Sequence, residues 1–482
     1  MSGGWHFIRR LLLLGAVTTV SGCLVGPDYR RPPAPVPTNF KELAGWHAAM
    51  PADAIDRGAW WSVYRDPTLD ALERQVDISN QTLKEAEAAY RQALATTAEA
   101  RAGLFPTLGL DASADRSRAG QGGGGSNGGF GGGGSIRNSF SLEGQASWDL
   151  DVWGKIRRTI ESDVAGAQAS AADLAAARLS AQGLLASDYF QLRGADTLTA
   201  LLDETIDQYQ RSLTIAQNQY ASGTASRSAV ITALTQLQTT QAQAINVGVQ
   251  RAELEHAIAV LTGRPPAELT LSHGTLAADV PVPPLVIPSA LLERRPDIAA
   301  AERRMQSENA LIGVAISAYY PDLSLSAAGG FAGSSLGSLF SAPDRVWSLG
   351  SAASDALFDA GARSAQVKSA EATYDESVAT YRQTILSAFQ GVEDQLSTLR
   401  ILQDQAEIQA EAVKSSQQAV AIALNEFQAG TVDYTTVVTA QATELGDEQT
   451  ALSIQQQRLV ASATLIEDLG GGWDAGALQT RS

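Results

Sequence analysis

The distribution of proline limits what this chain can fold into more than any other feature. Residues 107–264 contain no proline, residues 344–482 contain none either, and a proline-rich segment, residues 265–296, lies between them. Proline lacks a backbone donor and clashes with the preceding helical turn, so long helices avoid it. The pattern therefore predicts two long helical halves.

The two halves resemble each other in sequence. An offset of 215 residues aligns Phe105-Pro106 with Tyr320-Pro321, and an offset of 207 aligns NQYASGT at 218–224 with NEFQAGT at 425–431. Such self-similarity indicates an internal duplication. The offset changes in the region of the tract QGGGGSNGGFGGGGS at 121–135. We interpret this tract as a surface loop between two strands, and not as a phosphate loop or a domain linker.

Hydrophobic periodicity assigns long helices to both halves. Apolar residues recur every three or four positions between Gly361 and Phe427, which is typical of an amphipathic helix. The matching stretch of the first half is proline-free as well, so we expect helices at about 155–220 and 361–427. Each would be roughly 100 Å long at 1.5 Å per residue. A soluble coiled-coil spacer would also explain helices of this length.

Four shorter stretches have the period of β-strands. In FSLEGQASWDL (140–150), apolar or small residues alternate with polar and acidic residues. Strands are predicted at about 107–115, 139–151, 322–332 and 346–358. One apolar and one polar face over this length fit a membrane-spanning barrel strand with a wet interior, although a half-buried strand of a soluble sandwich has the same period.

Four strands do not suffice for a membrane barrel. An open sheet would leave unpaired backbone groups at its edges in lipid, so several copies of the chain must close it. Three chains would supply about twelve strands with cyclic symmetry. We therefore predict a mostly α-helical chain with a transmembrane β part, made of two tandem structural repeats that each supply two barrel strands and long helices. The expected assembly is a homotrimer with a 12-stranded β-barrel.

The N-terminus has the features of a secretory signal. Arg9 and Arg10 precede the apolar run Leu11–Val20, and small residues lead to Cys23. The sequence VSGC resembles a bacterial lipobox, so Cys23 is expected to carry a covalent lipid, N-acyl and S-diacylglycerol, and to hold the protein at a membrane. A chance VSGC within an ordinary signal peptide is the alternative. Leu24, where enterobacterial lipoproteins retained in the inner membrane have Asp, favours the outer membrane.

Composition excludes several partners and activities. No apolar run long enough for a spanning helix follows the first 25 residues, and the net charge of −17 argues against nucleic acid. Cys23 is the only cysteine, which excludes disulfides and thiolate metal sites. The four histidines show no metal-binding spacing. The GSSLG sequence at 333–337 matches GxSxG but lies between predicted strands, so we expect no enzyme, no metal and no cofactor apart from the lipid.

Six motifs together resemble the TolC-like outer-membrane efflux family, in particular its NodT-type lipoprotein branch. The motifs are CLVGPDYRRP (23–32), WWSVYRDPTLDAL (60–72), SWDLDVWGKIRR (147–158), PSALLERRPDIAAAERR (288–304), ISAYYPDLSLSAAGG (316–330) and FQAGTVDYTTVVTAQ (427–441). The resemblance implies a homotrimer whose barrel continues as a 12-helix periplasmic α-barrel. It also implies a passive exit duct for an inner-membrane pump of the RND type, joined through a periplasmic adaptor. A structural spacer without transport and the exit duct of a type I protein secretion system are the alternatives.

The resemblance also assigns the parts of the chain. The expected parts are a signal peptide (1–22), a lipid anchor with an extended arm (23–60), repeat 1 (61–264), a linker (265–296), repeat 2 (297–470) and a flexible tail (471–482). The mature protein would be anchored to the outer membrane, in contact with its lipid, and would extend into the periplasm.

Two chain reversals are expected at the periplasmic tips, near 221–226 and 429–434. The candidate adaptor-docking residues are Gly223, Thr224, Gly430 and Thr431, although these residues would also serve as plain turns. Asp433 and Arg227 are the nearest charged candidates for an iris-like aperture. Three copies of Asp433 around an axis would lower the potential and favour cations. Some relatives have two aspartates further along the helix, where this chain has Thr436 and Thr439, so Asp433 as a plain solvated residue remains the alternative.

Overall fold

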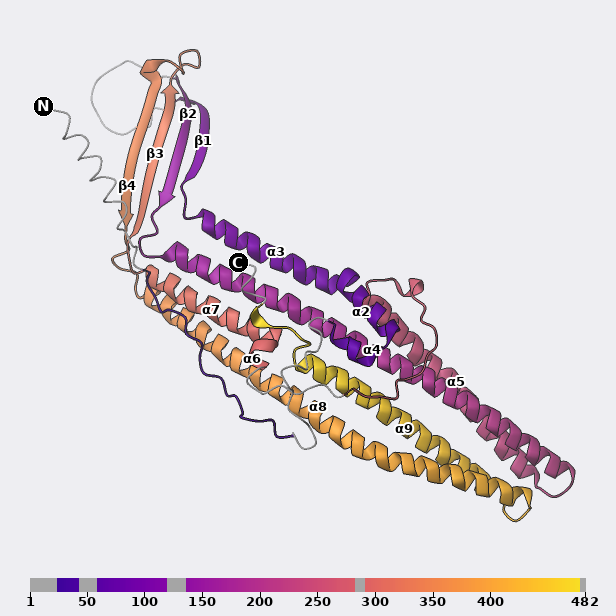
Figure 1. Ribbon diagram of the computed structural model, residues 1–482. Helices are drawn as coiled ribbons and strands as arrows, with labels where there is room; N and C mark the ends of the chain where they lie inside the picture. Colours follow the sequence, from indigo (N-terminus) through magenta and orange to yellow (C-terminus); the bar gives the residue numbers. More distant parts are fainter. Residues whose placement is uncertain (1–23, 43–58, 119–135, 282–290, 477–482) are drawn as a thin grey trace. The chain divides into compact units, whose positions relative to one another are not determined.

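The computed structural model describes residues 24–42, 59–118, 136–281 and 291–476 (Figure 1). The signal peptide, Cys23 and the glycine-rich tract at 121–135 lie outside these residues. The described residues divide into two compact units. Unit 1 contains residues 24–32 with the described parts of 91–167 and 303–379, and unit 2 contains the described parts of 33–90, 168–302 and 380–482.

Unit 1 contains an antiparallel sheet whose four strands follow the order of the sequence (Figure 1). The strands are β1 (Thr107–Arg118), β2 (Ile136–Asp149), β3 (Asp322–Gly333) and β4 (Arg345–Ser354). Each repeat therefore contributes one hairpin, β1-β2 or β3-β4, and the pairing of β2 with β3 joins the two hairpins.

β1 extends three residues past its predicted end and β2 begins three residues before its predicted start, whereas two strands end earlier than predicted for a clear reason. The strand expected to reach residue 151 ends at Asp149, because the Asp151 carboxylate accepts hydrogen bonds from the backbone of Ile156 and Arg157 and so caps the next helix. The strand expected to reach residue 358 ends at Ser354, which pairs with the first residue of β3, Asp322. Beyond that point β3 offers no partner. The alternation of apolar and polar residues does not report the capping bonds or the strand partners that set these ends.

The helices of the two repeats match in length. In chain order they are η1 (Trp60–Tyr64), α2 (Pro67–Ser79), α3 (Gln81–Ala102), α4 (Lys155–Ala221), α5 (Arg227–Leu261), η2 (Pro266–Glu268), α6 (Leu291–Arg294), α7 (Pro296–Ser317), η4 (Ala342–Asp344), α8 (Ala362–Gln428) and α9 (Tyr434–Asp468). The helices α4 and α8 have 67 residues each, α5 and α9 have 35 each, and α3 and α7 have 22 each. These equal lengths support the duplication read from the sequence. Among the described residues, no helix is both long and apolar enough to cross a membrane.

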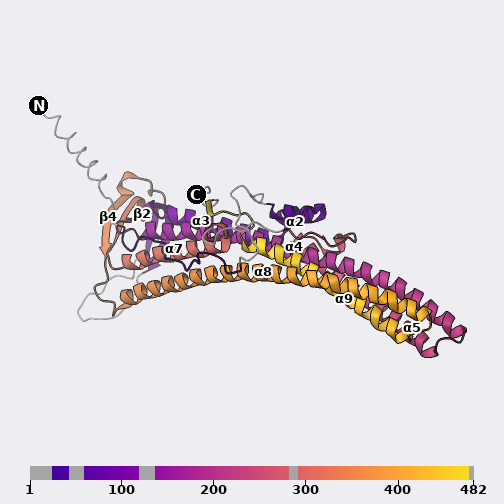
Figure 2. The ribbon, with the colours of Figure 1, turned by 60° about the horizontal axis from the view of Figure 1, so that its bottom comes forward.

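Unit 2 has two main hydrophobic cores. One lies where η1 and α2 pack on the middle of α4, and its fully buried members include Trp60, Leu69, Leu185 and Tyr189. Asp66 caps α2 there by accepting hydrogen bonds from the backbone amides of the second and third helical residues. The other core lies near the ends of the α4-α5 and α8-α9 hairpins. Figures 1 and 2 both show these four helices side by side up to their turns.

The ends of the chain are packed where the structure describes them. The arm at 24–42 has no regular secondary structure, as expected, and Phe40 is buried against Phe389 of α8 at a ring distance of 6.3 Å. At the other end, Trp473 packs against Ala172 and its neighbours. The Trp473 ring covers a small apolar surface there, and the flexibility expected for residues 471–482 stays a prediction.

Candidate functional site

The sheet of unit 1 has one apolar and one polar face. Pairs in register place apolar or small residues of all four strands on one face. Many of these side chains are exposed in the single chain, with Leu110 at 75%, Trp347 at 78% and Leu349 at 77%. An apolar surface spread over four strands is not stable in water and needs a cover. The sheet is therefore built to contact an apolar environment on one side.

The opposite face is polar and acidic. Asp111 pairs directly with Glu143, and Ser113 pairs with Ser141 with their hydroxyl oxygens 2.8 Å apart. Two carboxylates opposite each other on neighbouring strands repel, and this repulsion is weak only where water hydrates both groups. This face is therefore suited to water.

The edges of the sheet are incomplete in one chain. Within the part that the structure describes, β1 pairs only with β2, and β4 pairs only with β3. Both outer edges therefore carry backbone donors and acceptors that need further strands or water.

The first hairpin, between α4 and α5, reverses over five residues. Gly223 has a φ of +77°, which L-residues with a side chain rarely adopt. The backbone amides of Thr224 and Ala225 both donate to the carbonyl of Gln219, and the Thr224 hydroxyl donates to the same oxygen. Ser226 then caps α5, since its side chain accepts from the amide of Ala229.

The second hairpin, between α8 and α9, repeats this geometry. Gly430 has a φ of +73°, and both the amide and the hydroxyl of Thr431 donate to the carbonyl of Glu426. Asp433 stands at the N-cap of α9, but its carboxylate makes no capping hydrogen bond. The predicted reversals thus lie where the sequence placed them, and each Gly-Thr pair satisfies the last carbonyls of its long helix.

The structure brings the two hairpins together in unit 2. The Gln219 amide donates to the carbonyl of Phe427 at 3.2 Å, and the ring of Phe427 lies 5.1 Å from that of Tyr434. Burial raises the pKa of Tyr434 to about 12, so its hydroxyl stays neutral. A cavity of about 660 Å³ lies between the hairpins, lined by residues that include Thr224, Ser226, Gly430, Thr431 and Asp433.

The predicted site residues separate into two groups. Gly223, Gly430 and their threonines form the turns. Arg227 and Asp433 are exposed at the starts of α5 and α9, and among the described residues neither forms an ion pair within the chain. Cys23 lies outside the described residues.

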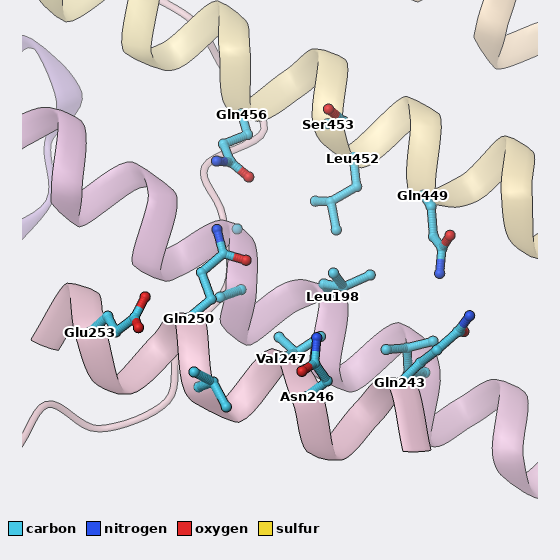
Figure 3. Close-up of a pocket in the computed structure, with 14 residues that line it drawn as sticks. Leu198, Gln243, Asn246, Val247, Gln250, Glu253, Gln449, Leu452, Ser453 and Gln456 are labelled. Atoms are coloured by element: carbon cyan, nitrogen blue, oxygen red, sulfur yellow. The ribbon is translucent and has the colours of Figure 1, made fainter. Parts of the chain in front are cut away.

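A second cavity lies further along unit 2, between α4, α5 and α9 (Figure 3). Its volume is about 610 Å³. Figure 3 shows amide side chains of α9, Gln449 and Gln456, facing Gln243 and Gln250 of α5. Glu253 of α5 adds one carboxylate to this lining, and Leu198, Val247 and Leu452 add apolar side chains.

Two buried charge clusters were not identified from the sequence. Asp196 of α4 accepts from Arg193, Arg251 and the backbone of Gly274, which fixes the residues after α5 onto α4 and α5, and these partners hold its pKa below the usual range despite burial. At the end of α9, Glu467 and Asp468 are partly buried beside Arg295. Burial and the neighbouring Asp468 raise the pKa of Glu467 to about 7. Arg295 belongs to the RRPD motif, so that motif was the signal that could have located this cluster.

The described residues hold no group of three or more His, Asp or Glu side chains arranged for a metal ion. GSSLG at 333–337 begins at the last residue of β3 and leads to η4 and β4, without the long helix that a nucleophile elbow requires. The fold and its surfaces thus define a class: a two-repeat protein that combines one amphipathic sheet with two long helical hairpins.

The comparisons with known proteins identify the family. Residues 72–264 and 287–471 match the family model described as outer membrane efflux protein. The chain belongs to the outer membrane efflux protein family, and it is an outer-membrane efflux channel protein.

Relatives and solved structures agree over nearly the whole length. The cation efflux system protein CusC of Escherichia coli O6:H1 is 28% identical over 468 residues, which are 96% of this chain and 99% of that protein. The pyoverdine export outer membrane protein OpmQ of Pseudomonas putida is 30% identical over 449 residues, which are 92% of this chain and 94% of that protein. The structure of the outer-membrane channel OprN superposes with a TM-score of 0.84 at 30% identity, over 94% of this chain and 100% of that one.

Proposed function

We propose that this protein is the exit duct of a tripartite efflux system and works as a homotrimer in the outer membrane. The sheet carries the proposal, because it has one exposed apolar face, one hydrated acidic face and two unpaired edges. Three copies with four strands each would close a 12-stranded barrel with the apolar face toward lipid. The long helices α4, α5, α8 and α9 of each copy would form a 12-helix periplasmic tunnel.

Cys23 is proposed to carry the N-acyl and S-diacylglycerol lipid after removal of residues 1–22. One lipid group of this kind holds a protein at a membrane without spanning it. The support is the lipobox-like VSGC sequence and the absence of any other cysteine from the sequence.

The hairpin tips are proposed to dock the periplasmic adaptor, which joins the duct to an inner-membrane pump of the RND type. Gly223, Thr224, Gly430 and Thr431 present the same turn geometry twice, so three copies offer six similar tips. A sixfold array of small, neutral turns is suited to a partner made of repeated hairpins.

Asp433 and Arg227 are proposed to line an iris-like aperture. Both are exposed, charged and within one turn of a tip, and neither is neutralised by an ion pair in the described chain. Three Asp433 carboxylates around an axis would attract cations, and Arg227 from a neighbouring helix would hold the aperture closed.

The duct is proposed to conduct passively and to leave substrate choice to the pump. Among its relatives, one name refers to cations and another to pyoverdine. The groove between Gln243 and Gln456 has a mixed lining of amides, apolar side chains and one carboxylate, Glu253, which fits a conduit with little selectivity.

Conductance and trimer formation test the proposal together. Protein extracted from the outer membrane is expected to migrate as a heat-sensitive trimer in detergent gels and to form discrete pores in planar bilayers. Deletion of its gene is expected to increase susceptibility to pump substrates. A monomeric elongated rod without conductance would instead support the structural spacer, and loss of a secreted protein without a change in drug susceptibility would support the type I secretion duct.

A further inference from the structure

The arm that follows Cys23 is held in a dedicated seat in unit 1. The backbone of Val25 donates to the carbonyl of Trp153 at 3.3 Å. Leu24 lies directly on Gly154, where the first carbon of any side chain would come within 2.6 Å of the leucine methyl group. The first two described residues of the arm thus rest on the junction between β2 and α4.

Arg158 of α4 makes most of the polar contacts of the seat. Its side chain is only 2% exposed. Nε donates to the carbonyl of Val25 at 3.0 Å, and Nη2 donates to the carbonyl of Gly26 at 3.2 Å and to the Asp28 carboxylate at 3.1 Å. Nη1 pairs with Glu161 at 2.7 Å. A buried guanidinium needs all its donors satisfied, and here the arm satisfies most of them.

The helix α7 supplies the other side of the seat. The amide of Asn309 donates to the carbonyl of Pro27 at 3.0 Å. Gly313 lies in direct contact with Gly26, and a methyl group on Gly313 would come within 2.8 Å of the carbonyl oxygen of Val25. The arm therefore fits only because both glycines lack a side chain.

The seat residues have no counterpart of the same type in the other repeat. The offset of 207 aligns Arg158 with Ala365, and the offset of 215 aligns Asn309 with Leu94 and Gly313 with Ala98. Ala365, Leu94 and Ala98 are all exposed, with no arm over them. At each of these positions, the helix that contacts the arm carries the arginine, asparagine or glycine that makes the contact, and the equivalent helix of the other repeat does not.

We propose that Arg158, Asn309 and Gly313 form an anchor seat that fixes the lipid-bearing end of the chain at the junction of sheet and helices. The inference rests on the proposed acylation of Cys23. Cys23 directly precedes Leu24 in the sequence, so holding Leu24 in the seat restricts how far the lipid attachment point can move from it. Arg158 is a positioning residue: it acts on the lipid only through the arm.

The anchor seat also couples anchoring to folding. Gly154 and Arg158 belong to repeat 1, whereas Asn309 and Gly313 belong to repeat 2, so the seat is complete only after both repeats have packed. An acylated chain whose seat is empty would remain tethered to the membrane with its sheet free to tilt and move away from the bilayer. Seating therefore keeps the sheet at the lipid surface, where its edges meet those of other copies.

The test replaces each seat residue by its counterpart in the other repeat. Arg158→Ala, Asn309→Leu and Gly313→Ala put residues into α4 and α7 that the equivalent helices already tolerate. The controls are the reverse changes, Ala365→Arg, Leu94→Asn and Ala98→Gly, at positions without an arm, and Gly166→Ala on α4, where an added methyl group meets nothing within 4 Å.

Arm position is measured by electron spin resonance between two labels in unit 1, one on Arg30→Cys in the arm and one on Thr96→Cys, which is exposed on α3. A Cys23→Ser chain leaves these as the only thiols and carries no lipid, so the distance is independent of acylation. We expect a narrow distance distribution in the parent and the controls, and a broad one in the seat variants. Unchanged narrow distributions in all seat variants would overturn the anchor seat.

The coupling is measured in chains that retain Cys23. Mass spectrometry of the N-terminal peptide is expected to show full acylation in every variant. The fraction of acylated protein that forms heat-sensitive trimers is expected to fall several-fold in the seat variants only. An unchanged trimer fraction despite a displaced arm would refute the coupling. A parent chain that is never acylated, or never trimeric, would count against the proposed function, while the label distances would still decide whether the seat exists.

Discussion

Asp433 and Ser226 occupy equivalent places in the two repeats but use their side chains differently. Ser226 caps α5 with its hydroxyl, whereas the Asp433 carboxylate makes no capping bond and faces solvent. A helix N-cap normally accepts an amide hydrogen bond, and losing that bond costs about 1 kcal/mol. Because Asp433 does not make this bond, its charge can be changed with little loss of stability, which makes it a good probe of the proposed aperture.

Removal of the Asp433 charge is expected to reduce cation selectivity. In Asp433→Asn trimers, three negative charges disappear from the proposed aperture, so the ratio of cation to anion permeability in planar bilayers should fall. Arg227→Ala should raise the open-channel conductance if Arg227 holds neighbouring helices together. Asp404→Asn, at an exposed position of α8, makes the same charge change far from the tips in the sequence and should have no effect. If conductance and selectivity of both tip variants equal those of the parent, the aperture assignment is wrong.

Glu467 is a residue whose burial sets a dependence on pH. Its carboxylate lies directly against Gly183, and burial together with Asp468 raises its pKa from 4.5 to about 7. As the pH rises from about 4.5 to 7, the unfolded chain releases this proton before the folded chain does. The free energy of unfolding therefore decreases across this window, by up to about 3 kcal/mol for a shift of this size.

Glu467→Gln is expected to remove this loss. The melting temperature of purified protein should fall between pH 5 and pH 8 in the parent, and it should fall less in the variant, because the amide does not ionise. Glu85→Gln, at an exposed position of α3, is the matched control and should follow the parent. If the melting temperatures of the parent and the Glu467→Gln variant change with pH in parallel, ionisation of Glu467 does not destabilise the folded protein.

At the scale of elements, each helical hairpin depends on one glycine in the left-handed region. Gly223 and Gly430 have open space around the position of a side chain, so a substitution costs only backbone strain. Alanine at each position should destabilise by about 1 kcal/mol, and asparagine, which tolerates this backbone conformation, by less. Gly248→Ala in the interior of α5, also in open space, should stabilise by about 0.5 kcal/mol. Chemical denaturation measures the free energy of unfolding of each variant. An equal effect of alanine at Gly430 and Gly248 would contradict the turn assignment.

The elements that sequence predicted are those set by local rules. The periods of two and of three to four residues located β1 to β4, α4 and α8, and glycine located both reversals. The contacts that periodicity does not predict join residues far apart in the chain. Arg158 lies 133 residues from Val25, and Asn309 lies 282 from Pro27. Periodicity does not report such pairs, so the sequence does not distinguish the buried Arg158 from an exposed arginine.

At the scale of the whole molecule, a single chain leaves its most apolar surface uncovered. Leu110 and Asp111 are neighbours in β1 and point to opposite faces, where they pair with Gly144 and Glu143 of β2. The proposed trimer resolves this asymmetry, since lipid covers the face of Leu110 and water fills the barrel on the face of Asp111. A soluble sandwich would require protein on the apolar face instead.

Arginine at these two neighbouring positions distinguishes the two arrangements. Leu110→Arg places a charge against lipid, which costs about 2–4 kcal/mol per chain near the middle of a bilayer and is repeated in each of the three copies. The amount of heat-sensitive trimer in the outer-membrane fraction should therefore drop strongly. Asp111→Arg is the matched control: it places the same side chain one residue later on the hydrated face, where it relieves the repulsion with Glu143, so trimer yield should be unchanged and cation selectivity reduced. If Asp111→Arg lowers the trimer yield as much as Leu110→Arg does, both faces are packed against protein and the lipid-facing barrel is wrong.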